Sequence, residues 1–405
     1  MDADTTPQAL RPGLAQRTCV AVFLSLWCFV AAFPLMWIAV MSFRAPQDAL
    51  SADPLRVLLG PATRAATGGL SVADLALGAA FVVLAWRAAT RWLPALADRM
   101  EPVHAVPRWL ALGLGYVLAL GAGGLFVLPW LAGLAGAVLA PIPFLGLLAE
   151  PAIGMTLDHY RAVWVRQEFY RNFINSMMVT LGVVVISLSV GTLAGYALAR
   201  SQSRIAFWLL VGALVFRALP HSVLATGYVP FFLNSREILA PLWEWPVTGW
   251  LFQLFSDRPP LLYGQPLATI IVLVSINQPF TIWMLRSFFQ NIPAELDEAA
   301  RVDGCSHFEA FWRAIMPVMW PGVITTGLFS FLLAYNDYLV TALLLDAQSM
   351  TMVPAITQFL NRDTRLSDQI EAIAAAVSIT APLFVLVLAF QRQIVAGLTQ
   401  GAVKG

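Results

Sequence analysis

Long uncharged runs alternate with short polar connectors along most of the chain. A helix needs about 20 apolar residues to cross ~30 Å of hydrocarbon, whereas a membrane strand would alternate over about 10 residues. The pattern therefore predicts an all-α, polytopic transmembrane helical bundle of about eight spans. The predicted apolar segments are 18–43, 70–86, 109–149, 173–199, 205–234, 267–285, 318–345 and 372–390.

The run 109–149 is long enough for one helix or for two. If 70–92 crosses the membrane, the arginines of the connector before residue 109 lie on the same side as Arg200 and Arg204. Cytoplasmic loops are enriched in arginine and lysine, so this arrangement is favoured. We expect eight spans with both termini cytoplasmic, and an interfacial or re-entrant stretch at 131–149, which contains Pro141 and Pro143.

The composition is that of an integral membrane protein. Hydrophobic residues make up 59% of the 405 positions and charged residues 12%, against roughly 25% charge in a soluble domain. A net charge of +1 gives no basic field that would attract nucleic acid. Cys19, Cys28 and Cys305 have no paired spacing, so neither a disulfide framework nor a zinc site is expected.

Residues 293–317, PAELDEAARVDGCSHFEAFWRAIMP, are unusually polar for this chain. Acidic residues open the segment, as the N-terminus of a helix favours, and Gly304 is placed to stop that helix. Ser306 and Glu309 have the spacing of a capping box that starts a second helix. The segment therefore predicts two short helices joined at a glycine.

The second helix of this segment carries bulky apolar residues at helical spacing. They would form a single apolar face, with Pro317 ending the helix. A docking element for a partner protein and an interfacial hairpin resting on lipid fit this pattern equally well. The apolar positions are Phe308, Phe311, Trp312, Ile315 and Met316.

Glu298-Ala299-Ala300, followed by Gly304 and by Ile315-Met316-Pro317, resembles the Glu-Ala-Ala coupling loop of ATP-binding-cassette importer permeases. Met316 stands where leucine is more usual. PFTIWMLRSFFQNIPAELDEAARVDG and the tail QRQIVAGLTQGAVKG are similar to the carbohydrate-uptake branch, specifically to the smaller maltose-type permease subunit.

The similarity divides the chain into three parts. Residues 1–43 form an N-terminal tail and first membrane helix, and residues 44–159 form an insertion with two extra spans. Residues 160–405 form the permease core, with the coupling loop at 293–317 and a cytoplasmic C-terminal tail. The resemblance implies that residues 399–405 reach toward the interface between the ATPase subunits.

The resemblance also implies a function and partners. The chain would be one permease subunit of a binding-protein-dependent, ATP-driven importer in the bacterial inner membrane, forming half of the path for a sugar or polyol. Its partners would be a second permease, an ATPase homodimer, an extracytoplasmic solute-binding protein and membrane lipid. Glu298 would form an ion pair with the ATPase, and Ala299 and Ala300 would pack closely against it. Asp303, Gly304 and Pro317 complete the motif.

The chain has no ATP-binding loop of the Walker A type. That loop needs a lysine between glycine and serine or threonine, and Lys404, the sole lysine, is followed by Gly405. No acid–base, nucleophilic or metal constellation suggests an enzyme. ATP and magnesium would be bound by the partner ATPase subunits, and no cofactor is expected in this chain.

Several polar residues interrupt the later apolar runs. Such groups are costly in lipid and usually face the bundle interior or a wet cavity. They are candidates for the sugar path, or for hydrogen bonds between helices, and Arg217 and Asp337 could neutralise each other. The residues are Arg217, His221, Asn277, Gln278, Tyr335, Asn336 and Asp337.

The alternative function is a stand-alone, ion-coupled secondary transporter. Asp74 and Asp337 would then be its ion or proton sites. Lone transporters often contain an internal repeat, and no repeat is visible here.

Overall fold

The computed structural model describes residues 13–99, 108–142, 145–201, 203–245, 248–254, 256–360 and 366–402. Helices dominate it, as predicted. In chain order the elements are α1 (Leu14–Ser42), α2 (Pro46–Ala49), α3 (Pro54–Leu59), α4 (Pro61–Thr67), β1 (Gly69–Ser71), α5 (Val72–Arg87), η2 (Ala88–Trp92), α6 (Leu93–Arg99), α7 (Arg108–Ala122), η3 (Gly123–Val127), α8 (Leu128–Leu139), η4 (Gly146–Leu148), β2 (Pro151–Gly154), α9 (Asp158–Arg161), η5 (Ala162–Arg166), α10 (Phe169–Arg200), α11 (Arg204–Arg217), α12 (His221–Leu233), α13 (Ser235–Glu244), α14 (Gly249–Gln253), α15 (Pro266–Gln290), α16 (Glu295–Val302), α17 (His307–Glu309), η6 (Ala310–Ile315), α18 (Met316–Tyr335), α19 (Leu339–Leu344), α20 (Met352–Leu360) and α21 (Leu366–Ala402).

Seven helices within the described residues are long and apolar enough to cross a membrane, which confirms the all-α, polytopic fold. They account for seven of the eight predicted apolar runs. The candidate spans are Thr18–Ser42, Val72–Leu96, Leu112–Leu139, Phe169–Arg200, Pro266–Gln290, His307–Tyr335 and Leu366–Gln391.

The eighth predicted run, 205–234, is broken into two helices. α11 ends at Arg217, and α12 begins at His221 with Pro220 as its N-cap. Proline lacks an N–H and disfavours helical conformation in the residue before it, which explains the break. The run therefore contains two shorter helices in place of one continuous span.

The run 109–149 contains one long helix, built from α7, η3 and α8. The prediction of a separate interfacial stretch is therefore wrong for residues 131–139, which continue this helix, because their uninterrupted apolar sequence offers nothing to end it. Residues 140–142 and 145–149 form turns and the short η4, and Pro143 lies outside the described residues.

Three π-helical turns each end two residues before a proline. The amides of Leu93, Leu128 and Met316 each bond to the carbonyl five residues earlier, and a proline follows each of them. A proline cannot donate the usual bond to the fourth preceding carbonyl, and its ring would clash with that group. The wider turn moves the carbonyl away, so these helices pass through their prolines instead of ending there.

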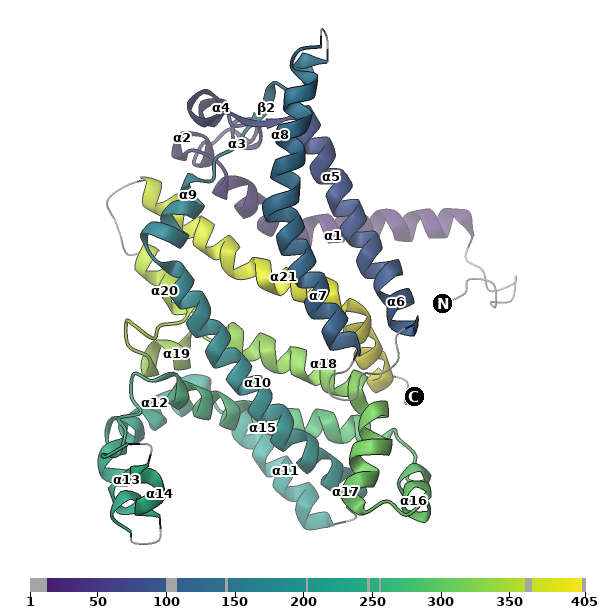
Figure 1. Cartoon of the computed structure of the whole chain (residues 1–405), viewed down its shortest axis with the longest axis vertical. Coiled ribbons are helices and arrows are strands. Elements are labelled where there is room, and N and C mark those ends of the chain that lie inside the picture. The colour runs from purple at the N-terminus through teal and green to yellow at the C-terminus, as the bar shows by residue number, and fades with distance from the viewer. Residues whose placement is uncertain are drawn as a thin grey trace.

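The centre of the bundle is formed by α10, α15, α18 and α21 (Figure 1). α10 and α15 approach closely because glycines face the partner helix. A Cβ at Gly191 would lie 2.7 Å from the Thr281 methyl group, and one at Gly195 would lie 3.0 Å from Leu285 Cβ. Small residues of this kind allow membrane helices to pack backbone to backbone.

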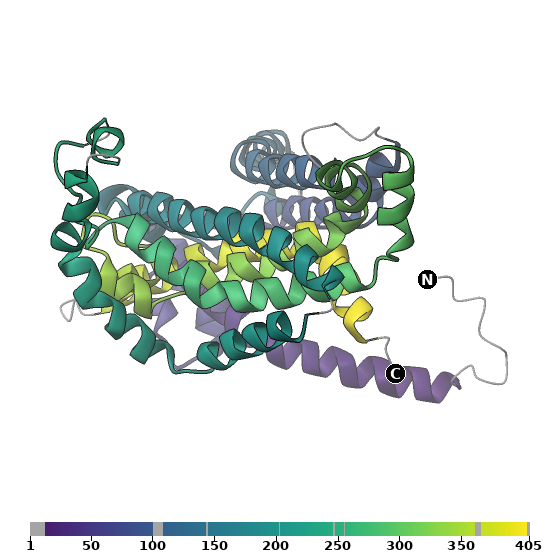
Figure 2. The ribbon, with the colours of Figure 1, turned by 90° about the horizontal axis from the view of Figure 1, so that it is seen from below.

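The extra helices of the predicted insertion form a hairpin. α5 with α6 runs beside α7 with α8, and α7 packs against α21 (Figure 1). The antiparallel strands β1 and β2 pair at the base of this hairpin, so the chain leaves and returns at one place. Figure 2 shows α1 on one side of the bundle and this hairpin on the other.

A small cap, residues 43–71 with 151–161, holds the base of the hairpin at the end where α1 finishes. Buried Arg44 donates from Nε to the Val57 carbonyl oxygen at 2.6 Å, and its other nitrogens donate to carbonyls that include that of Gly154. Buried Asp48 accepts hydrogen bonds of 2.7 Å from both the amide and the hydroxyl of Thr63. Arg44 thus places a positive charge at the C-terminal end of α3, and Asp48 places a negative charge at the N-terminal end of α4. Each charge is favourable for the dipole of the helix that it contacts.

The opposite end of the bundle carries the predicted coupling loop. The first turn of α1 and the last turn of α21 lie at the same end as α16 and α17, whereas α13 and α14 lie at the other end (Figure 2). α10 finishes at the α16 end, which places Arg200 beside the loop. Residues 403–405 of the predicted C-terminal tail lie outside the described residues.

Candidate functional site

The coupling loop, residues 293–317, folds as two helices joined by a tight turn. α16 covers eight residues and carries Glu295, Asp297 and Glu298 in its first turn, as the sequence predicts. Gly304 follows with φ of +92°, a left-handed conformation that side chains disfavour. The Ser306 hydroxyl accepts from the Glu309 amide, and the Glu309 carboxylate accepts from the Ser306 amide, which completes the predicted capping box.

The prediction that Pro317 ends the second helix is wrong. α17, η6 and α18 form one continuous helix that runs from the loop through the membrane. The π-helical turn η6 displaces the carbonyl that would otherwise meet the proline ring. The loop is therefore joined to α18 without a flexible connection.

The predicted single apolar face divides into two. Phe311, Ile315 and Met316 are buried in a core formed with the ends of the neighbouring helices α15 and α10 that lie nearest the loop. Phe308 and Trp312 remain exposed, at 66% and 56% of their surface. The π-helical turn changes the residues per turn, so the side chains no longer follow a spacing of 3.6.

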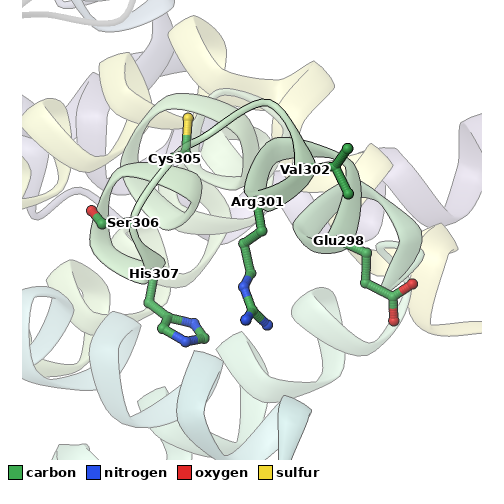
Figure 3. A pocket seen from close by; sticks show the side chains of 6 residues that line it. All are labelled: Glu298, Arg301, Val302, Cys305, Ser306 and His307. Carbon is green, nitrogen blue, oxygen red and sulfur yellow. The ribbon is translucent and has the colours of Figure 1, made fainter.

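An open hollow of about 520 Å³ lies on the outer surface of the loop. It is lined by Glu298, Arg301, Val302, Cys305, Ser306 and His307. Figure 3 shows the Arg301 and His307 side chains pointing to one side of the turn and Cys305 to the other. Val302 is 88% exposed, an unusual position for an aliphatic side chain at a helix end. The hollow therefore combines charged, polar and apolar groups on a rigid frame.

The residues of the Glu-Ala-Ala motif lie on this outer surface. Glu298 and Ala299 are exposed and Ala300 is partly buried, and Glu298 forms no ion pair with any described residue. Asp303 is exposed at the turn beside Gly304. Within the part of the chain that the structure describes, no ion pair or side-chain hydrogen bond engages Glu298 or Asp303, and their predicted roles toward an ATPase remain predictions.

Asp297 has a role that sequence reasoning missed. One of its carboxylate oxygens accepts a 2.6 Å hydrogen bond from the Tyr196 hydroxyl, and the other accepts from Arg200 Nε at 2.7 Å. The sequence suggested only a favourable helix N-terminus for this acid. Roughly a hundred positions separate it from its partners, so no local spacing could have revealed the contact.

Three of the predicted path residues bond to neighbouring helices. Asn277 is fully buried and donates to the Ser330 hydroxyl at 2.8 Å. Gln278 donates to the Ser187 carbonyl at 3.3 Å, and the Tyr335 hydroxyl donates to the Ile379 carbonyl at 3.1 Å. These bonds fit the alternative that such residues hold helices together.

The other candidates lie nearer the surface of the chain. The pairing of Arg217 with Asp337 that the sequence left open is absent among the described ion pairs: the Arg217 guanidinium lies 4.5 Å from the centre of the Phe280 ring. Asp337 accepts from the Thr341 amide at 3.1 Å, and His221 is exposed at the start of α12. Asn336 is exposed.

Asp74, a candidate ion site of the alternative function, is part of a helix cap. Its carboxylate accepts from the amide and hydroxyl of Ser71 at 2.9 and 2.8 Å. Both residues lie at the start of α5, beside the base of the hairpin. A carboxylate engaged in this way serves the local structure of the helix.

A known family matches the region that contains the coupling loop. The model of the binding-protein-dependent transport system inner membrane component family covers residues 187–400. The chain belongs to this family. It is therefore a multi-pass membrane permease subunit of an importer, and this membership favours the importer over a stand-alone secondary transporter. α1 to α9 precede the matched region.

Two permease proteins of other transport systems are similar in sequence to this importer permease over most of their own length. The trehalose transport system permease protein SugB of Mycobacterium tuberculosis is 32% identical over 252 residues, which cover 62% of this chain and 83% of that protein. The diacetylchitobiose uptake system permease protein DasC of Streptomyces coelicolor is 32% identical over 253 residues, which cover 62% of this chain and 82% of that protein.

The fold of the importer permease is also found in a solved structure. That structure is described as a bacterial ABC transporter involved in the import of the acidic polysaccharide alginate. The TM-score is 0.52 at 16% sequence identity, and the match covers 96% of this chain and 99% of the other. It supports the fold over almost the whole chain.

Proposed function

We propose that this importer permease carries a carbohydrate and receives its driving force through the coupling loop, which docks on a partner ATPase subunit. The observation that carries the proposal is the exposure of Val302 and Phe308, at 88% and 66%, on a loop otherwise fixed by a buried core. Apolar side chains at the centre of a patch, with charged groups around them, are typical of protein interfaces. Glu298 and Arg301 supply such charges.

The proposal assigns each motif residue a role. Glu298 forms an ion pair with the ATPase, the small Ala299 and Ala300 allow the two proteins to approach, and Gly304 with Asp303 makes the turn. Pro317 belongs to the motif as the position at which the loop helix passes through η6 into α18. The chain supplies no ATP site of its own, and its partners bind ATP and magnesium.

We further propose that the end of the bundle with the coupling loop is cytoplasmic, so that both termini face the cytoplasm. The arginines at the ends of α10 and α11 nearest the loop, Arg200 and Arg204, support this orientation under the positive-inside rule. α13 and α14 then face the binding protein. A second permease completes the assembly with the ATPase homodimer.

The transport path would form between this chain and the second permease. Of the predicted path residues, Arg217, Asn336 and Asp337 are the best candidates, because none of them forms a hydrogen bond between helices among the described residues. Asn277, Gln278 and Tyr335 are secondary candidates. The named relatives transport trehalose and diacetylchitobiose, so these disaccharides are the first solutes to test.

The test is purification of the tagged chain in gentle detergent from its own host, with identification of the co-purifying proteins. Recovery of an ATPase and a second permease, with ATP hydrolysis stimulated by a binding protein loaded with trehalose or diacetylchitobiose, would support the proposal. Recovery of the chain alone, without ATP hydrolysis, would refute it.

A pair of substitutions separates docking from general damage. Val302→Asp places a charge at the centre of the proposed interface and should remove the ATPase from the purified assembly. Leu55→Asp is the control, because Leu55 is also exposed, at 64%, but lies on α3 at the opposite end of the bundle. Equal loss of the ATPase in both variants would contradict docking at the loop.

A further inference from the structure

We propose that Arg200, Asp297 and Tyr196 form a rigid joint that makes α10 move together with the coupling loop. The three are positioning residues for energy transfer within the importer. The inference rests on the proposed function, because it concerns how movement of the docked loop reaches the membrane helices.

One arginine ties three segments together at this joint. Arg200 is the last residue of α10, and its Nε donates to Asp297 on α16 at 2.7 Å. Its Nη1 donates to the carbonyls of Phe289 and Ile292, at 3.2 and 3.1 Å, where α15 ends and the chain turns toward the loop. The fork of a guanidinium can satisfy several acceptors in fixed directions, which a lysine cannot do.

Tyr196 adds a second connection one turn earlier on α10. Its hydroxyl donates to the other oxygen of Asp297 at 2.6 Å, so the carboxylate is held from two sides by the same helix. The Tyr196 ring packs against Phe289 and Phe311, with centroid distances of 5.5 and 4.9 Å. The joint therefore contacts α10, α15, α16 and the helix that continues into α18.

The ion pair is shielded from water, in contrast to the other pairs among the described residues. The side chains of Arg200 and Asp297 are 23% and 15% exposed, whereas those of Arg171 and Glu168 are 64% and 49% exposed. Exposed pairs are screened and contribute little, but removing one member of a buried pair leaves an uncompensated charge. The joint should therefore resist displacement of α16 relative to α10.

Among the described residues, the outer surface of α16 makes no comparable attachment to α10, because Glu298, Ala299 and Val302 are exposed to solvent. A force applied to that surface can reach α18 directly through the continuous helix α17–η6–α18. It reaches the end of α10 most directly through Asp297 and through the aromatic contacts of Tyr196. Loss of the ion pair should leave the first route intact and weaken the second.

Spin-label distances in the full complex can follow the two routes separately. Labels are placed on the loop at Glu295→Cys and at the end of α10 at Ser201→Cys, each paired with a reference label at Ala52→Cys in the cap. Glu295 does not line the docking hollow. The native cysteines are replaced by serine, and because Cys305 does line the hollow, retention of the ATPase by the cysteine-free chain is checked first. Both distances are measured without nucleotide and with ATP plus vanadate.

In the unsubstituted chain we expect ATP plus vanadate to change both distances. In Arg200→Gln and in Asp297→Asn, the loop distance should still change, whereas the change at Ser201 should fall at least twofold. Arg200→Lys should retain part of it through the ion pair alone. Arg171→Gln, at the other end of α10, is the matched control and should behave as the unsubstituted chain.

The outcomes distinguish this inference from the function on which it rests. An undiminished change at Ser201 in both Arg200→Gln and Asp297→Asn would refute the joint and leave ATPase docking intact. Absence of any response to ATP plus vanadate in the unsubstituted complex would refute the proposed function, and the joint with it. Tyr196→Phe, which removes a single hydroxyl, guards against misfolding and should give a smaller loss of the same kind.

Discussion

Gly304 permits a prediction in which the conformation of the turn and the fit to a partner can be separated. Its φ of +92° lies in the left-handed region, yet a Cβ added there would meet no atom within 4 Å. The cost of a substitution within this chain is therefore one of backbone conformation and not of steric overlap. For alanine this cost is about 1–2 kcal/mol, because only glycine, and to a lesser extent asparagine and aspartate, adopt the conformation readily.

In the free chain the substituted turn can relax to another conformation, and docking must then restore the left-handed one. The affinity for the ATPase should therefore fall in Gly304→Ala, by up to roughly 5–30-fold. Gly304→Asn should lose less, because asparagine tolerates the turn. Gly304→Asp has nearly the same shape as asparagine but adds a charge beside Val302, and it should lose the most. The measurement is the amount of ATPase retained per tagged chain after purification, titrated against added ATPase.

The order of the three variants is the decisive result. Retention of the ATPase by Gly304→Asp at the level of the unsubstituted chain would show that the turn is not at the interface, and would refute the reasoning. Equal losses in all three variants would show that any Cβ disrupts docking and that the turn conformation is not the cause. Thermal unfolding of each chain in detergent is the control for global damage.

Three further predictions concern the rest of the fold. Asp48→Ala should destabilise the cap by about 1–3 kcal/mol, because it leaves the buried amide and hydroxyl of Thr63 without an acceptor, and chemical denaturation would measure this. Burial lowers the pKa of His159 below 6.5, against the opposing effect of its hydrogen bond to the Arg44 carbonyl. The folded state therefore binds a proton on His159 less readily than the unfolded state does. The free energy of unfolding should be at its full value above pH 6.5 and should fall as the pH drops below it. Thermal unfolding between about pH 7.5 and pH 5.5 should therefore show a decline that His159→Gln flattens; an unchanged slope would contradict it. Gly191→Val should separate α10 from α15 at a cost of about 1–3 kcal/mol and lower the thermal unfolding temperature, whereas Gly212→Val, where a Cβ meets no atom within 4 Å, should not.

The sequence alone determined the features that depend on local physics. The length of the apolar runs predicted the membrane helices, because each helix must satisfy its own backbone hydrogen bonds within the hydrocarbon. The turn at Gly304 and the cap formed by Ser306 and Glu309 were also predictable, since a left-handed residue and a capping box act over only a few positions. The motif around Glu298 identified the family for the same reason.

The tertiary structure decided which side chains meet across the bundle. Arg200 and Asp297 are 97 positions apart, and Asn277 and Ser330 are 53 apart, so no periodicity links them. Whether the helix ends at Pro317 also depended on the structure around it, because a proline ends a helix unless the preceding turn widens to make room for its ring. Local hydrogen bonds depend on residues that are neighbours in the sequence, whereas the contacts between distant helices depend on the packing of the whole bundle.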